Sequence, residues 1–458
     1  MIMKKTMTLL AVSCLVGGCG IYGRYSRPEP DVELDSLYRS PANPADTSSA
    51  ASMPWRELFT DPQLQTLIAA GLENNKDLGI ARLQVEEAQA TLANARLSYL
   101  PSLNLTPQGG AGRYNGQSQM TYSIGASAAW EVDIFGKTTN AKRGAESVLE
   151  QRQAYTLAVQ TQLVATIAES YCTLLMLDEQ LAISGETLTN WDETVATLEA
   201  LVEAGKVNDV AVRQARASRS ALEASMLTLR RSISETENSL CALLGEPSHA
   251  VSRGTLDAQQ FPDELSAGVP LQLLSNRPDV RQAEAALAEA FYATNAARSA
   301  FYPSLTLSGT LGWTNSGGGA ILNPGKWLVN AVAQLTAPLF NNGANVASLK
   351  IAKARQKEAE LAFGQALLDA GNEVNDALTE WQTADGRIRL DEQQILDLEA
   401  AAEKTALLVR YTSANYLEVL TAQQSLLSAR LTLAQDRTAR IHGLIHLYHA
   451  LGGGQTEN

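Results

Sequence analysis

Residues 301–314 read FYPSLTLSGTLGWT, and the order of these residues is the most informative pattern in the chain. After Pro303 the side chains alternate between apolar and polar, with Leu305, Leu307, Leu311 and Trp313 set against Thr306, Ser308, Thr310 and Thr314. Successive side chains of a β-strand point to opposite faces, so the pattern predicts a strand with one apolar and one polar face. Alternation over about ten residues, with aromatic residues near the ends, is typical of transmembrane barrel strands.

Three other segments show the same alternation, so we expect a set of strands that covers residues 102–113, 119–134, 304–314 and 326–339. The pattern is weaker at 326–339, and the first strand dissolves into Gly109-Gly110. One such segment would also fit a half-buried strand of a soluble sheet. Several of them between long helices favour a membrane sheet.

These predicted strands are too few to close a barrel within one chain. Open strand edges are not tolerated in lipid, so a chain that spans the membrane in this way has to oligomerise. Two copies would give about eight strands with a packed interior, and three would give about twelve strands around a lumen.

The strand at 304–314 belongs to a unit that the chain contains twice. The order Asp77…Pro101-Ser102-Leu103 recurs as Asp279…Pro303-Ser304-Leu305. Each unit reads as a helix, two strands, a long helix and a return helix, which is an α+β architecture made by duplication. The predicted divisions are a first repeat at 55–246, a linker at 247–268, a second repeat at 269–452 and a tail at 453–458.

Heptads predict the long helices, at 137–203 and 345–411, with return helices at 208–245 and 415–451. The apolar positions are Ile167, Leu174, Leu181, Leu188, Val195 and Val202 in the first half, and Val374, Trp381, Ile388, Ile395, Ala402 and Val409 in the second. At 1.5 Å per residue the first long helix would extend ~100 Å. Heptads alone would also fit a coiled-coil spacer without a pore.

Residues 1–18 resemble a lipoprotein signal peptide. Lys4 and Lys5 precede a short apolar run, which ends in Gly17-Gly18-Cys19. We expect Cys19 to become the lipidated first residue and residues 19–54 to form an extended segment. An ordinary secretory signal with an incidental cysteine is the alternative. Gly20 after the cysteine agrees with sorting to the outer membrane.

The net charge of −13 argues against nucleic acid as a partner. No Ser/His/Asp or Cys/His set stands out, so we expect neither enzymatic activity nor a cofactor. Cys172 and Cys241 are interpreted as small buried hydrophobes, with no histidine near them in sequence. A shared helical face carries His442, His446 and His449 at a spacing that can bind metal, but without a nearby carboxylate or thiolate we expect no metal site.

Several motifs resemble the outer membrane factors of tripartite efflux and type I secretion systems, and the drug-efflux lipoproteins most. These are Trp55–Leu64, Tyr99–Leu103, Trp130–Gly136, Phe301–Leu305, Pro338–Phe340 and Arg410–Leu420. The resemblance covers nearly the whole mature chain. It implies a homotrimer with a twelve-stranded β-barrel in the outer membrane and a twelve-helix periplasmic tunnel. Its implied role is a passive exit duct for drugs or other small molecules. These would come from an inner-membrane transporter of the RND (resistance–nodulation–division) type through a periplasmic adaptor (membrane fusion) protein.

The resemblance also assigns roles to the two turns between long and return helices. It places the adaptor-docking tips at Gly205, Val207, Asn208, Ala414, Asn415 and Tyr416, and the periplasmic aperture at Leu417, Glu418, Thr421 and Asp209. Gly205 can end a helix in the left-handed region, and an asparagine can cap the next helix. Thr421 stands where the family usually has an acid, so we expect weaker charge gating, with Glu418 as the nearest acid.

Overall fold

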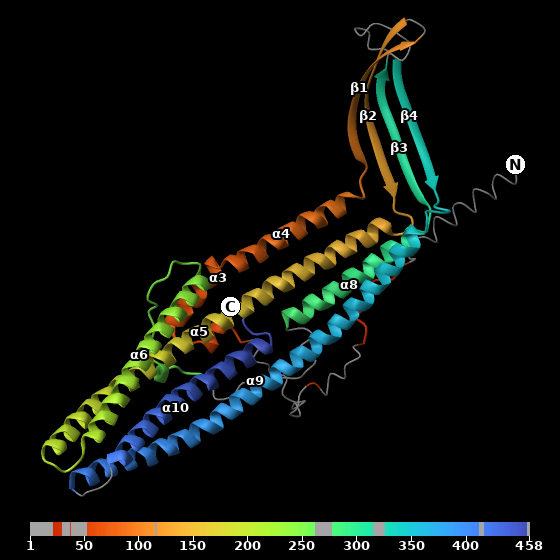
Figure 1. Cartoon of the computed structure of the whole chain (residues 1–458). Helices are drawn as coiled ribbons and strands as arrows, with labels where there is room; N and C mark the ends of the chain where they lie inside the picture. The colour runs from red at the N-terminus through yellow and green to blue at the C-terminus, as the bar shows by residue number, and fades with distance from the viewer. Residues whose placement is uncertain are drawn as a thin grey trace. The chain divides into compact units, whose positions relative to one another are not determined.

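The computed structural model describes residues 22–29, 37, 53–114, 117–261, 277–314, 326–411 and 416–455 (Figure 1). Cys19, Ala414, Asn415 and part of the predicted linker lie outside these residues. The first half comprises α2 (Trp55–Leu58), α3 (Pro62–Asn74), α4 (Lys76–Leu97), β1 (Ser102–Tyr114), β2 (Gln117–Val132), α5 (Lys137–Glu203), α6 (Asp209–Leu244) and η3 (Leu256–Ala258). The second comprises α8 (Pro278–Ser299), β3 (Ser304–Thr314), β4 (Lys326–Thr336), α9 (Ala344–Tyr411) and α10 (Tyr416–Ala450). The duplicated helix-and-strand unit is therefore confirmed.

The strands form one antiparallel sheet in the order β1-β2-β3-β4. Each half contributes a hairpin, and the hairpins join through β2 and β3. Gly125 lies opposite Gly312 at this junction. A Cβ atom on Gly312 would lie 2.3 Å from the Ile124 carbonyl oxygen, so the junction requires a glycine there.

The predicted ends of two strands need correction. β2 ends at Val132 instead of residue 134, because the Asp133 carboxylate turns to the start of α5 and accepts hydrogen bonds from the Thr138 and Thr139 amides at 3.0 and 2.8 Å. β4 ends at Thr336 instead of residue 339. Pro338 has no amide proton to donate to a ladder, which accounts for the early end.

The chain divides into two compact units. Unit 1 contains residues 1–31, 83–154 and 281–365, and therefore all four strands; unit 2 contains residues 32–82, 155–280 and 366–458. Among the described helices, none is both long enough and apolar enough to cross a membrane.

The main core of unit 2 forms where α2 and α3 pack against α5, α6 and α10. Trp55, Phe59, Ile167 and Tyr171 are at most 1% exposed there. The Tyr171 hydroxyl donates to the Asp61 carboxylate at 2.6 Å, and Asp61 also caps α3 by accepting from the Gln63 amide. A second cluster contains the buried Trp191 and Leu198 of α5, and the heptad residues Leu188, Val195 and Val202 pack against it partly buried.

Candidate functional site

The strand register places most of the large apolar side chains of the four strands on one face of the sheet. Leu105, Ala126, Leu311 and Val329 form one continuous row across it. Leu105, Leu311 and Val329 are 71%, 54% and 74% exposed. The apolar face also carries Leu103, Ile124, Ala128, Trp130, Leu305, Leu307, Trp313, Trp327, Ala331, Ala333 and Leu335.

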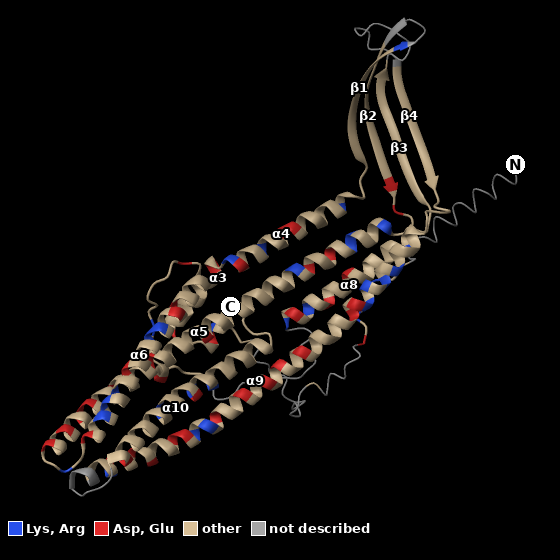
Figure 2. Cartoon of the chain, viewed as in Figure 1, with Lys and Arg blue, Asp and Glu red and all other residues tan. Residues whose placement is uncertain are grey.

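The opposite face of the sheet is mainly polar, although Leu328 and Val332 of β4 lie on it, opposite Gly312 and Ser308. Its matching row is Asn104, Ser127, Thr310 and Asn330. Figure 2 shows the strands almost free of charge. The charged residues within them are Arg113, Glu131 and Lys326, each at or next to a strand end. A sheet with one apolar face, one polar face and charge only at its ends has the side-chain distribution of a membrane strand set.

Aromatic pairs lie at both ends of the sheet. Trp313 and Trp327 meet edge to face with ring centroids 5.3 Å apart, one residue from the far ends of β3 and β4. Phe135 and Tyr302 stack at 4.9 Å where the strands meet the helices. Aromatic girdles at both interfaces are typical of outer-membrane strands.

The outer edges of the sheet lack a partner strand in this chain. Within the described residues β1 pairs only with β2, and β4 pairs only with β3. Each therefore presents a row of backbone amides and carbonyls along one side.

The first tip, between α5 and α6, has the capping geometry that the sequence predicts. Gly205 has a φ of 70°, and the amides of Gly205 and Lys206 donate back to the Val202 and Leu201 carbonyls. The Asn208 side chain accepts from the Val210 amide at 3.1 Å and so begins α6. Both capping predictions are confirmed. Val207 is half-buried within this turn.

At the second tip, α10 begins at Tyr416, which packs on the cluster around Trp191 together with the buried Leu420. Leu417 is 48% exposed, and Glu418 and Thr421 are exposed beside it. The Thr421 hydroxyl donates to the Leu417 carbonyl at 2.8 Å, so this side chain is held against its own helix.

The charges near the two tips differ in their partners. Asp209 is paired with Arg213 at 2.6 Å, four residues along α6. Glu418 forms no ion pair with any residue that the structure describes. Of the two acids assigned to the aperture, Glu418 is therefore the one whose charge is uncompensated.

A cavity of about 290 Å³ lies between α5, α9 and α10, beyond the second tip. Gln423 crosses it and donates to the Thr194 hydroxyl at 3.1 Å. Arg430 closes the other side through Glu186 at 3.4 Å and Glu399 at 2.6 Å. These contacts could not be predicted from the sequence, since Gln423 and Thr194 are 229 residues apart.

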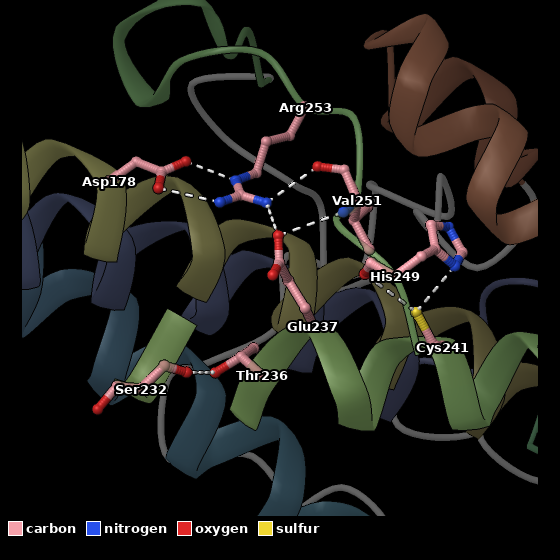
Figure 3. A network of polar contacts seen from close by, with 8 residues as sticks. All are labelled: Asp178, Ser232, Thr236, Glu237, Cys241, His249, Val251 and Arg253. Carbon is pink, nitrogen blue, oxygen red and sulfur yellow. Dashed lines mark hydrogen bonds and ion pairs between the residues drawn. The ribbon is translucent and has the colours of Figure 1, made fainter. Parts of the chain in front are cut away.

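The segment after α6 is tied to the helices by a polar network (Figure 3). The Arg253 guanidinium bridges Asp178 of α5 and Glu237 of α6, and hydrogen bonds to both carboxylates raise its pKa. His249 lies 3.5 Å from the Cys241 sulfur. Cys241 is buried, as predicted. The prediction that no histidine lies near it is wrong in space, because His249 follows eight residues later and folds back onto it.

The histidine face of α10 meets carboxylates that are distant in sequence. His446 lies 3.1 Å from Glu169 of α5 and 2.8 Å from Glu380 of α9. Hydrogen bonds to Glu169 and Glu380 raise the pKa of His446 to about 9, against the lowering effect of burial. His442 instead has a lowered pKa because it is buried, and it meets the Glu169 carbonyl at 3.2 Å. No group of three metal-ligating side chains arises among the described residues.

Comparison with known proteins adds a family match, two similar sequences and one similar structure. A family model described as outer membrane efflux protein matches residues 67–246 and 269–453. The chain is 31% identical over 449 residues to the cation efflux system protein CusC of Escherichia coli O6:H1, covering 97% of each chain. It is 29% identical over 459 residues to the probable outer membrane lipoprotein SilC of Salmonella typhimurium, covering 99% of each. The open state of the Neisseria gonorrhoeae MtrE outer membrane channel is a structural match with a TM-score of 0.86 and 27% identity, covering 96% of this chain and 99% of that one.

We expect the substitution His446→Gln to flatten the pH dependence of stability between about pH 6.5 and 9. The folded-state pKa of about 9 lies above the ordinary value of 6.5. The charged form of His446 therefore makes its full contribution to the free energy of unfolding below pH 6.5. This contribution is lost as the pH rises through 9. With the side chain 42% exposed, screening limits the contribution to about 1 kcal/mol.

Urea denaturation of the purified wild type and variant, at the low and the high end of this pH range, measures the change in the free energy of unfolding. His442→Gln is the matched control, because its lowered pKa keeps His442 neutral throughout the range. If wild type and His446→Gln lose equal stability at high pH, the ion-pair assignment is wrong.

Proposed function

The chain belongs to the outer membrane efflux protein family, and from this we infer that it is the outer-membrane channel of a tripartite efflux pump. In this role three copies form a passive exit duct. Drugs or other small molecules reach it from an inner-membrane transporter, of the RND type in our proposal, through a periplasmic adaptor. The duct performs no chemistry of its own.

The sheet is the observation that carries this proposal. Its apolar face suits lipid and its polar face suits a water-filled lumen. Closing three four-stranded sheets into a ring pairs β4 of one copy with β1 of the next, and about twelve strands then enclose a lumen. Two copies would leave about eight strands around an interior filled by side chains.

The alternative function is a coiled-coil envelope lipoprotein without a pore. The buried heptads of α5 fit both functions. A spacer, however, has no use for a sheet that exposes one apolar face extending from β1 to β4.

We also propose that Cys19 carries the lipid anchor. Tyr22, three residues later, lies beside Gly136 at the start of α5. Arg27 pairs with Glu284 of α8 at 2.5 Å, and the Tyr25 ring meets Phe291 at 5.8 Å. Three residues can span at most about 10 Å, so acyl chains on Cys19 would start close to the helix end of the sheet.

Leu417 is proposed to form the periplasmic constriction. Three-fold symmetry would gather three exposed leucines at the mouth, with Glu418 beside each one. Asp209 is already paired with Arg213, and Thr421 carries no charge, so the acidic component of the gate rests mainly on Glu418. The turns around Gly205 and Tyr416 are the proposed adaptor-docking tips.

The substitution Leu307→Arg should prevent assembly, while Ser308→Arg should be tolerated. The arginine at 307 would face lipid at a cost of about 2–4 kcal/mol near the membrane centre, and that at 308 would face the lumen. Trimer yield in purified outer membranes measures the effect. Equal yields of the two variants would contradict the assignment of the faces.

Leu417→Ala should raise the conductance of the closed channel, because it removes the apolar constriction. Glu418→Gln should reduce cation preference and block by divalent ions, and Thr421→Asp should increase both, since like charges at the mouth attract cations. Single-channel recording measures all three. Unchanged conductance in Leu417→Ala would place the constriction elsewhere.

Cys19→Ser should yield a protein without acyl chains that remains uncleaved or is poorly anchored. Intact-mass spectrometry of the wild-type protein should find a mature first residue at Cys19 with the added mass of its acyl groups. A mature terminus at another residue would refute this assignment.

A further inference from the structure

The start of α9 is basic and contains no acid. Residues 344–357 include Lys350, Lys353, Arg355 and Lys357 without any Asp or Glu, although the chain as a whole has a net charge of −13. Figure 2 shows Lys and Arg in blue along the part of α9 that follows β4. The same compact unit contains this part of α9 and the whole sheet.

Three of these cations share one side of the helix. Lys350, Lys353 and Lys357 follow a spacing of three and four residues, which aligns them in a stripe. The packed side of α9 is a different one, because Asn345 donates to the Ala300 carbonyl at 2.8 Å and the Ala352 carbonyl accepts from Thr294 at 3.2 Å. All three lysines are exposed.

The lysines differ in their partners. Lys357 pairs with Glu360 at 3.1 Å. In the described part of the chain, Lys350 and Lys353 have no ion-pair partner. Their charges are thus available to an external anion.

The stripe lies close to the end of the sheet. α9 begins eight residues after the end of β4, and the intervening Leu339 and Phe340 are 98% and 84% exposed. Lys350 and Lys353 lie ~9 and ~14 Å along the helix from Ala344, whereas Lys357 lies ~20 Å along it. A headgroup layer is about 5–8 Å thick on each side of the bilayer, and a lysine can extend its ammonium group towards it.

We propose that Lys350 and Lys353 bind the phosphate groups of anionic phospholipids in the leaflet nearest the helices. The proposal rests on the proposed membrane insertion of the sheet. Ammonium groups act as point charges towards phosphate, and a juxtamembrane lysine strengthens attraction to an anionic surface by about fivefold. Three copies would surround the channel with six such lysines, three pairs in all.

Quenching of tryptophan by brominated lipid tests this with the full-length trimer. The apolar face provides Trp130, 38% exposed and two residues from the helix end of β2. The protein is reconstituted into phosphatidylcholine vesicles containing about one-fifth phosphatidylglycerol, with either lipid brominated in turn. Wild type should prefer phosphatidylglycerol several-fold, and the double variant Lys350→Gln, Lys353→Gln should lose most of this preference.

Lys357→Gln is the matched control and should keep the wild-type preference, because Lys357 is farther from the sheet and already paired. The proposal would be overturned if the control lost as much of the preference for phosphatidylglycerol as the double variant does. It would also be overturned if the double variant kept the wild-type preference. Displacement of phosphatidylglycerol by 20 mM inorganic phosphate would also overturn it, by indicating a general anion site. Absence of quenching by either brominated lipid would instead refute membrane insertion itself.

Discussion

The unpaired outer edges of β1 and β4 constrain everything else in this molecule. A sheet that exposes a broad apolar face belongs in lipid, but lipid offers no partner for backbone amides and carbonyls. The four strands of one chain cannot satisfy both requirements. Pairing β4 of one copy with β1 of the next meets both requirements only when the copies form a closed ring. An open head-to-tail array always leaves one unpaired β1 edge and one unpaired β4 edge. Assembly and membrane insertion are therefore a single requirement.

Duplication supplies the rest of the geometry. Each half contributes one hairpin, and the halves meet where Gly125 lies opposite Gly312, a position that has no room for a side chain at residue 312. Each half also contributes a long helix with a return helix, and most heptad residues of α5 lie in or against the cores that these helices form. The same unit thus builds the sheet and the helical hairpins. The turns that end the hairpins carry the residues assigned to docking and gating.

Short-range patterns in the sequence predicted much of this fold. Alternation from Leu305 to Thr314 predicted a strand and its two faces, and Gly205 and Asn208 predicted a turn that the structure contains. Strand ends were less accurate, because Asp133 caps a helix instead of extending β2. The contacts of Gln423 with Thr194, and of His446 with Glu169 and Glu380, could not be predicted, since they depend on how supercoiled helices align. The i, i+4 pairing of Asp209 with Arg213 was visible in the sequence, and it would weaken the contribution of Asp209 to the proposed gate.

We propose that assembled copies of this chain enclose a continuous lumen through the outer membrane. Planar-bilayer recording of the purified wild-type trimer tests it most directly, with vesicle flotation to establish that the protein has inserted. A continuous lumen should give discrete, uniform conductance steps, each from one inserted trimer. Inserted protein that produces no steps would contradict it and would favour a structural spacer.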